Sequence, residues 1–258
     1  MPYSPDLADI AARLRAAGCV FAEDEARLVA GAAATAGDVD ALVERRAKGE
    51  PIEHVVGWAG FRGLRVAVAP GVFVPRRRTE FLAGQAVARA RAVPRPVVLD
   101  LCCGSGAIAA AVAAEVPGAE VYAADVDPAA VACARRIVGA RVYAGDLFDP
   151  LPGDLRGRVD VLVANVPYVP TGDIALLPAE ARDHEPRTSL DGGADGLDVL
   201  RRVAAAAPEW LAPGGALLSE TGSRQVAAAV AAVTGAGLGA HVAHEDELDA
   251  TVIIATAP

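Results

Sequence analysis

From Pro96 onward, apolar runs of strand length alternate with stretches of helical spacing, and this alternation restricts the fold more than any other feature. Strands are expected at 97–101, 120–125, 140–143, 160–164, 216–221, 240–244 and 251–255, and helices at 107–115, 128–137, 197–210 and 223–234. Such alternation is typical of an α/β protein with a doubly wound, mostly parallel sheet. Ligands of these sheets bind outside the carboxyl ends of the strands. We therefore expect the functional residues in the segments that follow the strands.

Residues 1–50 show helical spacing of apolar residues and predict a small N-terminal helical domain. Ser4 is the expected N-cap of its first helix, because a proline and an acidic residue follow it. A second helix is expected at 23–31. The third is expected to begin at Asp38 as its N-cap and to end at a glycine.

Residues 51–78 are rich in glycine and proline and predict a connector rather than a domain. Within it, residues 62–69 alternate between apolar and polar types and predict one strand of a β-hairpin. A helix is expected from residue 79 to 92. The larger domain, which holds the sheet, is therefore expected to span 79–258.

Composition and charge indicate a globular protein. Apolar residues make up 53% and charged residues 22% of the 258-residue chain. No apolar run approaches the roughly 20 residues needed to span a bilayer, and the start of the chain lacks a signal-peptide pattern, so we expect a cytoplasmic protein. Residues 1–80 carry 11 acidic and 11 basic side chains, which leaves the net charge of −9 in the remainder. An acidic sheet domain argues against nucleic acid as the partner.

The four cysteines predict neither a metal site nor disulfides. They are Cys19, Cys102, Cys103 and Cys133, and none forms a CxxC pair. Free cysteine is among the most buried residue types, so we interpret them mainly as small apolar residues.

Three strand ends carry the residues of a candidate cofactor site. After the strand at 97–101, a turn containing two glycines precedes a helix, and its candidate residues are Asp100, Cys102, Gly104, Ser105 and Gly106. Such a turn lets the backbone approach a ligand and presents helix N-terminal amides to it. The GxGxxG pattern of dinucleotide-binding folds is not present, because Ala109 occupies the third glycine position.

The next two strand ends continue this pattern. Asp125 and Val126 end the second strand, and Asp146 and Leu147 follow the third. One glycine turn is weak evidence for a site, but an ordered set at three successive strand ends is strong evidence: Asp100 with Gly104 and Gly106, then Asp125, then Asp146. The ordered set resembles class I S-adenosylmethionine-dependent methyltransferases, whose sheet is Rossmann-like.

That resemblance implies a role for each strand end. The glycine turn would lie beneath the methionine portion of S-adenosylmethionine, Asp125 would bind its ribose, and Asp146 with Leu147 would flank its adenine. By the same resemblance Asn165, at the end of the fourth strand, also contacts the cofactor.

The fourth strand ends in Asn165-Val166-Pro167-Tyr168, a polar corner stiffened by proline. It resembles the Asn-Pro-Pro-Tyr motif of amino-methyltransferases, which act on planar amide or amine nitrogens. The Asn165 side-chain oxygen and the Val166 carbonyl would each accept one N–H of the acceptor nitrogen, and Tyr168 would stack on the planar group. These contacts would orient the nitrogen and stabilise its developing positive charge. Val166 stands where the motif has its first proline.

Two flanking stretches indicate which nitrogen is methylated. Residues 49–80 and 185–215 resemble the HemK/PrmC family of protein-(glutamine-N5) methyltransferases, through Val74-Pro75-Arg76 and Glu185-Pro186-Arg187 among other residues. That family methylates the glutamine of the Gly-Gly-Gln loop in peptide-chain release factors. The resemblance implies a release factor as partner, Asn165 and Tyr168 as residues that hold the glutamine, and Glu185 in the loop that shapes the pocket.

Two other functions remain open at this point. A nucleic-acid amino-methyltransferase would bring a flipped base to Tyr168, although the acidic balance speaks against it. A cofactor-binding protein with weak or no catalysis is the second alternative, because Val166 changes the motif.

Overall fold

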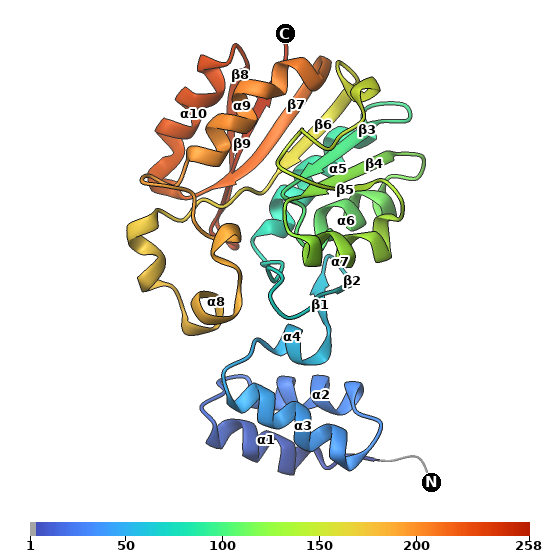
Figure 1. Cartoon of the computed structure of the whole chain (residues 1–258), viewed down its shortest axis with the longest axis vertical. Helices are drawn as coiled ribbons and strands as arrows, with labels where there is room; N and C mark the ends of the chain where they lie inside the picture. Colours follow the sequence, from blue (N-terminus) through green and yellow to red (C-terminus); the bar gives the residue numbers. More distant parts are fainter. Residues whose placement is uncertain (1–3) are drawn as a thin grey trace.

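The computed structural model describes residues 4–258, which form a helical bundle, a connector and a sheet covered by helices on both faces (Figure 1). The bundle consists of α1 (Leu7–Ala16), α2 (Ala22–Ala32) and α3 (Ala36–Ala47). Its buried apolar residues, from Ile10 to Val43, form a core separate from that of the sheet. This separate core supports our proposal that the bundle is a domain of its own.

The first and third helices begin at residues other than those predicted. Asp6, not Ser4, caps α1, and its carboxylate accepts the N–H of Ala8 at 2.9 Å. Thr35, not Asp38, caps α3. Asp38 is instead the third residue of the helix, and its carboxylate accepts the N–H of Thr35 at 2.8 Å. This reciprocal pair is a capping box, which satisfies two backbone N–H groups rather than one.

The connector contains a short helix and a hairpin. The helix α4 (Ile52–Val56) was not predicted. The hairpin pairs β1 (Trp58–Phe61) with β2 (Leu64–Ala67), so the predicted strand at 62–69 began two residues too early. Its first two residues form the turn instead, where Arg62 has φ +47° and Gly63 has φ +75°.

The main sheet confirms the predicted doubly wound, mostly parallel architecture of seven strands. Its order is β5-β4-β3-β6-β7-β9-β8, in which the first five are parallel and β9 is antiparallel to both its neighbours. The strands are β3 (Val97–Leu101), β4 (Glu120–Asp125), β5 (Val142–Ala144), β6 (Val159–Ala164), β7 (Leu211–Thr221), β8 (Gly239–Glu245) and β9 (Ala250–Thr256).

Helices cover both faces of this sheet (Figure 1). Alternate strand residues point to opposite sides, so Val98 and Val163 face one core while Leu99 and Leu162 face the other. The first core is completed by α5 (Thr79–Arg91), α6 (Ala107–Glu115) and α7 (Pro128–Val138), and the second by α9 (Asp198–Trp210) and α10 (Val226–Gly235).

The order of the strands defines where a ligand can enter. The chain runs from the central β3 outward to β4 and β5, and then returns to place β6 on the other side of β3. Connections that leave in opposite directions open a crevice at the carboxyl edge of the sheet. The carboxyl ends of β3, β4 and β6 therefore border one crevice.

A long segment between β6 and α9 covers this edge. It contains η2 (Thr171–Leu176), α8 (Ala179–His184) and η3 (Arg187–Ser189). Two ion pairs tie it to earlier parts of the chain: Glu180 contacts Arg46 of α3 at 2.7 Å, and Glu185 contacts Arg76 of the connector at 2.6 Å. The segment thus links the bundle and the connector to the sheet.

Glycines let this segment pack directly against the backbone of the Asn165–Tyr168 corner. A Cβ on Gly192 would lie 2.6 Å from the Pro167 carbonyl oxygen, and one on Gly196 would collide with the Tyr168 carbonyl oxygen and the Gln225 amide. The Gln225 Nε2 also donates to the Tyr168 carbonyl at 2.9 Å. Only residues without a side chain fit at these two positions.

Gly196→Ala should therefore destabilise the protein by about 2–5 kcal/mol, because φ of +79° is strained for alanine and the new methyl overlaps backbone atoms. The measurement is the midpoint of chemical denaturation. Gly172→Ala is the matched control, since a Cβ at Gly172 meets no atom within 4 Å and its φ is not in the left-handed region. Equal midpoints for the two variants would contradict the packing described here.

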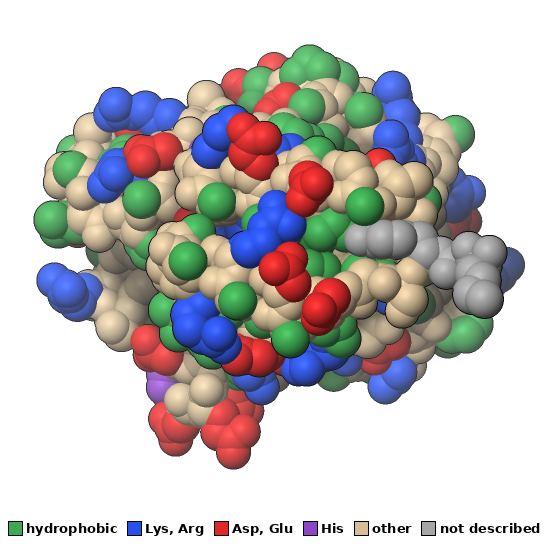
Figure 2. Space-filling model, turned by 90° about the horizontal axis from the view of Figure 1, so that it is seen from below, with side chains coloured by type: hydrophobic (Ala, Val, Ile, Leu, Met, Phe, Trp, Pro, Cys, Tyr) green, Lys and Arg blue, Asp and Glu red, His purple; other side chains and the backbone are tan. Residues whose placement is uncertain are grey.

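The bundle end of the molecule carries charges of both signs. Figure 2 shows basic and acidic side chains interspersed with apolar ones on this face. Several are paired, as in the 2.8 Å contacts of Arg13 with Asp40 and of Lys48 with Glu44. Across residues 4–258, no helix is both long and apolar enough to cross a membrane.

Candidate functional site

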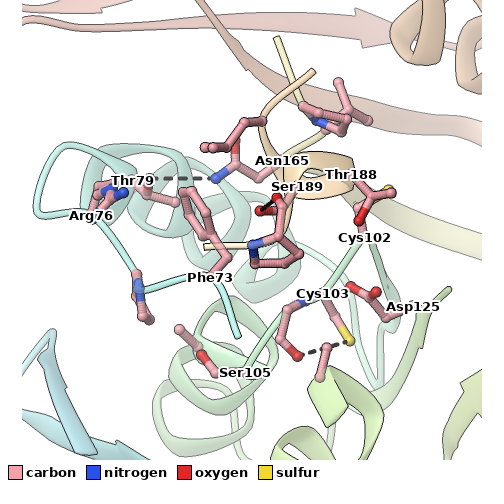
Figure 3. A pocket seen from close by; sticks show the side chains of 18 of the residues that line it. Phe73, Arg76, Thr79, Cys102, Cys103, Ser105, Asp125, Asn165, Thr188 and Ser189 are labelled. Atoms are coloured by element: carbon pink, nitrogen blue, oxygen red, sulfur yellow. Dashed lines mark hydrogen bonds between the residues drawn. The ribbon is translucent and has the colours of Figure 1, made fainter. Parts of the chain in front are cut away.

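A cavity of about 500 Å³ lies at the carboxyl edge of the sheet. Its walls come from the ends of β3, β4 and β6, from the connector, and from the segment that contains α8. Figure 3 shows Asp125, Asn165 and Thr79 converging on it from three different elements. The predicted site residues that line the cavity are Asp100, Cys102, Gly104, Ser105, Asp125, Val126, Asn165, Val166, Pro167 and Tyr168.

The turn after β3 takes the conformation expected of a ligand-binding loop. Cys102, Gly104 and Gly106 all have left-handed φ, of +55°, +54° and +81°. A Cβ on Gly104 would meet nothing within 4 Å, so this position offers open space beside the backbone. A Cβ on Gly106 would lie 2.9 Å from that of Ala134. Gly106 therefore allows α6 to approach α7 and is not part of the cavity wall.

Asp125 holds this turn in place. Its Oδ2 accepts the N–H of Gly104 at 2.8 Å, and its Oδ1 accepts the N–H of Asp127 at 2.9 Å. Burial raises the pKa of Asp125, while these backbone N–H groups oppose the rise. Each carboxylate oxygen can accept a further hydrogen bond. Asp125 can therefore bind two hydroxyl groups of a ligand while it fixes the loop beside them.

Asp100 is the most deeply buried acid of the cavity, with 1% of its surface exposed. Its Oδ2 accepts the N–H of Ala109 at 3.0 Å, but its Oδ1 has no hydrogen-bond partner. Burial raises the pKa of Asp100 to about 7, and the charge of Asp125 adds to the rise. An unpartnered buried oxygen is costly, and a cationic ligand group would supply the missing donor.

Four predicted site residues lie outside the cavity lining. Gly106 is one, and Asp146, Leu147 and Glu185 are the others. Asp146 follows the edge strand β5 and pairs with Arg202 of α9 at 2.6 Å. An adenine contact by Asp146 and Leu147 therefore stays a prediction.

Glu185 supports the cavity wall through contacts with the connector. Its buried carboxylate accepts the N–H of Val74 at 3.2 Å and pairs with Arg76. Burial raises the pKa of Glu185, and the charge of Arg76 opposes this. Its neighbour Pro186 lines the cavity, so Glu185 attaches the wall to the connector. A direct contact between Glu185 and substrate stays a prediction.

The corner after β6 contains a side-chain acceptor that has no hydrogen-bond partner. The Asn165 Nδ2 donates to the Thr79 hydroxyl across 3.5 Å, which is the dashed contact in Figure 3. The Asn165 Oδ1 is buried and has no partner. The Ala164 carbonyl, one residue earlier, is already satisfied by the Ser219 hydroxyl at 2.7 Å. The corner thus leaves the Asn165 side-chain oxygen without a donor from the protein, in a residue that lines the cavity.

Tyr168 is fixed by contacts at both its hydroxyl and its ring. The hydroxyl donates to Glu220 at 2.6 Å, and the guanidinium of Arg78 lies 5.6 Å from the ring centre. Burial and the charge of Glu220 raise the pKa of Tyr168, so the phenol stays protonated. A fixed aromatic ring at this position can pack against a flat acceptor group.

Sequence reasoning missed the residues that support this corner. Phe73 and Thr79 come from the connector and the start of α5, and both line the cavity. Glu220 is near the end of β7 and contacts both Thr79 and Tyr168. One signal was available for Glu220: like Asp125 and Asn165, it comes after a run of buried residues, near the carboxyl end of a strand.

The cysteines and acids do not suggest a metal centre. All four cysteines are free thiols, and burial raises the pKa of each, which keeps them protonated. Among residues 4–258, no cluster of three or more His, Cys, Asp or Glu side chains could hold a metal ion.

Known proteins are similar to this chain in sequence over most of its length. Residues 64–177 match the family model of the methyltransferase small domain. A release factor glutamine methyltransferase of Geobacter sulfurreducens is 44% identical over 71% of this chain and 65% of that protein. One of Xylella fastidiosa (strain 9a5c) is 40% identical over 85% of this chain and 80% of that protein. The chain belongs to the release factor glutamine methyltransferase family. This confirms the resemblance found in the sequence and, with it, a methyltransferase of the S-adenosylmethionine-dependent class.

The comparisons also limit what membership implies. The chain spans just under two thirds, 65%, of the length of the Geobacter relative. A 4-amino-L-phenylalanine/4-methylamino-L-phenylalanine methyltransferase of Streptomyces pristinaespiralis is 38% identical over 77% of this chain and 70% of that protein. Proteins of similar closeness therefore differ in acceptor, and the acceptor has to be argued from the site.

The cavity residues fit S-adenosylmethionine. The unpartnered Asp100 Oδ1 suits an ammonium group, Asp125 has acceptor capacity for two ribose hydroxyls, and open space lies beside Gly104. Asp100 and Asp125 lie on the adjacent parallel strands β3 and β4, and Gly104 lies in the turn that follows β3. They would hold the cofactor along the carboxyl edge, next to the Asn165 corner.

Cofactor affinity should depend on pH through Asp100. Its pKa of about 7 means that the carboxyl is protonated below that pH, whereas an ammonium ligand favours the ionised form. Binding must then release a proton, so the affinity should fall by about tenfold per pH unit below 7. Titration calorimetry from about pH 5.5 to 7.5 measures this, a range below the pKa of roughly 7.7–8.0 at which an α-amino group loses its own proton. Asp100→Asn cannot ionise and should give a flat profile; an equally steep profile in that variant would contradict the assignment.

Proposed function

We propose that this protein methylates the side-chain amide nitrogen of a glutamine in a peptide-chain release factor, in its Gly-Gly-Gln loop. The observation that carries the proposal is the buried, unpartnered Oδ1 of Asn165, a residue that lines the cavity. An amide nitrogen is a poor nucleophile because its lone pair is delocalised. It therefore needs acceptors that orient it and stabilise the positive charge that grows on it.

The corner supplies these acceptors. The Asn165 Oδ1 would take one N–H of the glutamine amide, and the Val166 backbone carbonyl would take the other. Valine in place of the motif proline keeps this carbonyl, since every residue has one. The ring of Tyr168, fixed by Glu220 and Arg78, would pack against the planar amide.

When bound, S-adenosylmethionine supplies an electrophilic methyl group and leaves as S-adenosylhomocysteine, while the amide nitrogen exchanges one of its two protons for the methyl. The protein holds both reactants in line and excludes water. A cavity of about 500 Å³ is in the usual range for small-molecule sites, roughly 300–1,000 Å³. A protein acceptor must therefore insert a single side chain, which suits a glutamine on a loop.

A protein acceptor also fits the surface better than a nucleic acid. Residues 81–258 carry the whole net charge of −9. On the bundle face in Figure 2, basic side chains are interspersed with acidic ones and do not form one patch. Nucleic-acid sites usually present clustered basic residues.

The test is transfer of label from labelled S-adenosylmethionine to purified release factor. We expect label on the wild-type factor and none on the factor with Gln→Ala in its Gly-Gly-Gln loop. Absence of transfer, or label that survives Gln→Ala, would refute the proposal. Parallel reactions with ribosomal RNA and with 4-amino-phenylalanine show whether another amine is preferred. Mass spectrometry of release factors from cells with and without the gene extends the test in vivo.

A further inference from the structure

Glu220, near the end of β7 and with only 3% of its surface exposed, accepts two hydrogen bonds and pairs with one arginine behind the lining of the site. The Thr79 hydroxyl donates to its Oε2 at 2.8 Å, and the Tyr168 hydroxyl donates to its Oε1 at 2.6 Å. The Nε of Arg78 lies 3.0 Å from the same Oε1. Thr79 also contacts Asn165, the first residue of the corner, and Tyr168 is the last residue of that corner.

We infer that Glu220 and Thr79 are positioning residues that orient the Asn165 side chain, so that its oxygen and not its nitrogen faces the acceptor. The inference rests on the proposed function, in which the Asn165 Oδ1 accepts the glutamine N–H. It assigns a role to a buried acid and a hydroxyl that need not touch either reactant.

The direction of each hydrogen bond follows from the chemistry of the groups. An ionised carboxylate can only accept, so the Thr79 hydroxyl must direct its single proton to Glu220. The Thr79 oxygen then has only lone pairs to offer Asn165. The NH₂ group of Asn165 is the end that can donate to it, and this is the 3.5 Å contact in the structure. The Asn165 oxygen is left pointing away, where it has no partner.

The reversed amide is disfavoured by the same rule. With its oxygen toward Thr79, Asn165 would place an acceptor against an oxygen whose proton is already used. Either that pair would repel, or the Thr79 proton would turn away from Glu220 and leave a buried carboxylate without a donor. A buried polar atom without a partner costs about 1–3 kcal/mol. At 3.5 Å the Asn165 contact is long, so it selects an orientation and adds little strength.

The other carboxylate oxygen of Glu220, Oε1, accepts the hydroxyl of Tyr168. Since Tyr168 donates to Glu220, the hydroxyl end of its ring is held by the carboxylate that also accepts from Thr79. One buried charge therefore coordinates the two side chains proposed to hold the glutamine amide. Arg78 compensates that charge from the more exposed side.

The chain offers an unusually clean spectroscopic test. Asn165 is its only asparagine, so labelling asparagine with ¹⁵N gives one side-chain amide signal in an NMR spectrum. Thr79→Val removes the hydroxyl but keeps the shape, and Thr79→Ser keeps the hydroxyl. We expect the Asn165 NH₂ signal to move in the valine variant and to stay close to wild type in the serine variant. Unchanged signals in the valine variant would overturn the inference.

Kinetics provide the second readout. Thr79→Val should lower kcat for glutamine methylation by about tenfold, the effect of one lost hydrogen bond, while the Kd for S-adenosylmethionine changes by less than about twofold. Thr79→Ser should restore kcat. Glu220→Gln should lower kcat at least as much. The glutamine amide can donate to Thr79, whose hydroxyl could then donate to the Asn165 oxygen, so that the hydrogen bonds run in the reverse direction. A residue that serves only packing would tolerate valine, so unchanged kcat in Thr79→Val would also overturn the inference.

The two readouts separate this inference from the proposed function. If the wild-type protein does not methylate glutamine, the proposed function fails, while the Asn165 signal still decides whether Thr79 orients the amide. Thermal unfolding of each variant shows whether a change in kcat merely follows a loss of folded protein. A kcat that falls in proportion to the folded fraction would assign Thr79 and Glu220 a structural role and refute the inference.

Discussion

Asn165→Ala is expected to lower kcat for glutamine methylation by roughly a hundredfold to a thousandfold, the effect of removing one preorganised polar group at a reacting centre. The free Oδ1 of Asn165 is the side-chain acceptor that the corner presents to the cavity. Alanine would leave the Val166 carbonyl as the other acceptor. The glutamine amide would then lose its alignment with the methyl group more than its affinity for the site, so kcat falls more than binding does. Initial rates at saturating cofactor and release factor measure the change.

Binding of the cofactor separates this effect from a general disturbance. Asp100 and Asp125, which are proposed to hold S-adenosylmethionine, lie on β3 and β4 and not on β6. Asn165→Ala should therefore change the cofactor Kd far less than kcat. Thr171→Ala, six residues later at an exposed position, is a control that loses a polar group outside the cavity lining. A fall in kcat below about threefold for Asn165→Ala would remove the basis of the proposed mechanism.

Local sequence patterns predicted most of the sheet because burial acts on each strand separately. Apolar runs identified β3, β4 and β6 closely, since a central parallel strand is covered on both faces. The start of β7 was predicted five residues too late. Pro213, Gly214 and Gly215 indicate a turn locally, yet the strand begins at Leu211, which pairs with Val159 across a register shift. Tertiary pairing overrode a local signal there.

In the candidate site, too, locally encoded residues could be predicted and residues placed by tertiary contacts could not. Residues at strand ends could be predicted, because a polar side chain directly after a buried apolar run needs a hydrogen-bond partner at the edge of the sheet. The residues that support them could not, since Thr79 meets Glu220 across 141 positions of sequence and Val74 meets Glu185 across 111. No local period encodes such contacts. The conformation of the turn could not be predicted either. Cys102 has a left-handed φ, whereas the motif indicates this conformation only for its glycines.

Asp125→Ala should raise the Kd for S-adenosylmethionine by about a hundredfold. Two hydrogen bonds from ribose hydroxyls to a carboxylate contribute about 3 kcal/mol together, and each 1.4 kcal/mol is a factor of ten. The substitution also removes the acceptor of the Gly104 and Asp127 N–H groups, so the turn after β3 loses its anchor. Asp125→Asn keeps one oxygen acceptor and should lie between alanine and wild type. Titration calorimetry with the cofactor measures all three.

Two further variants make the Asp125 result specific. Asp154→Ala removes the same charge at the opposite edge of the sheet, just before β6 begins, and should leave the Kd unchanged. A comparable loss there would mean that net charge, and not ribose binding, controls affinity. Asp146→Ala tests the predicted adenine contact: a clear loss would show that the cofactor extends beyond the cavity lining to the turn after β5. An unchanged Kd would place the adenine wholly against the residues after β4, with the exposed Val126 as its apolar surface.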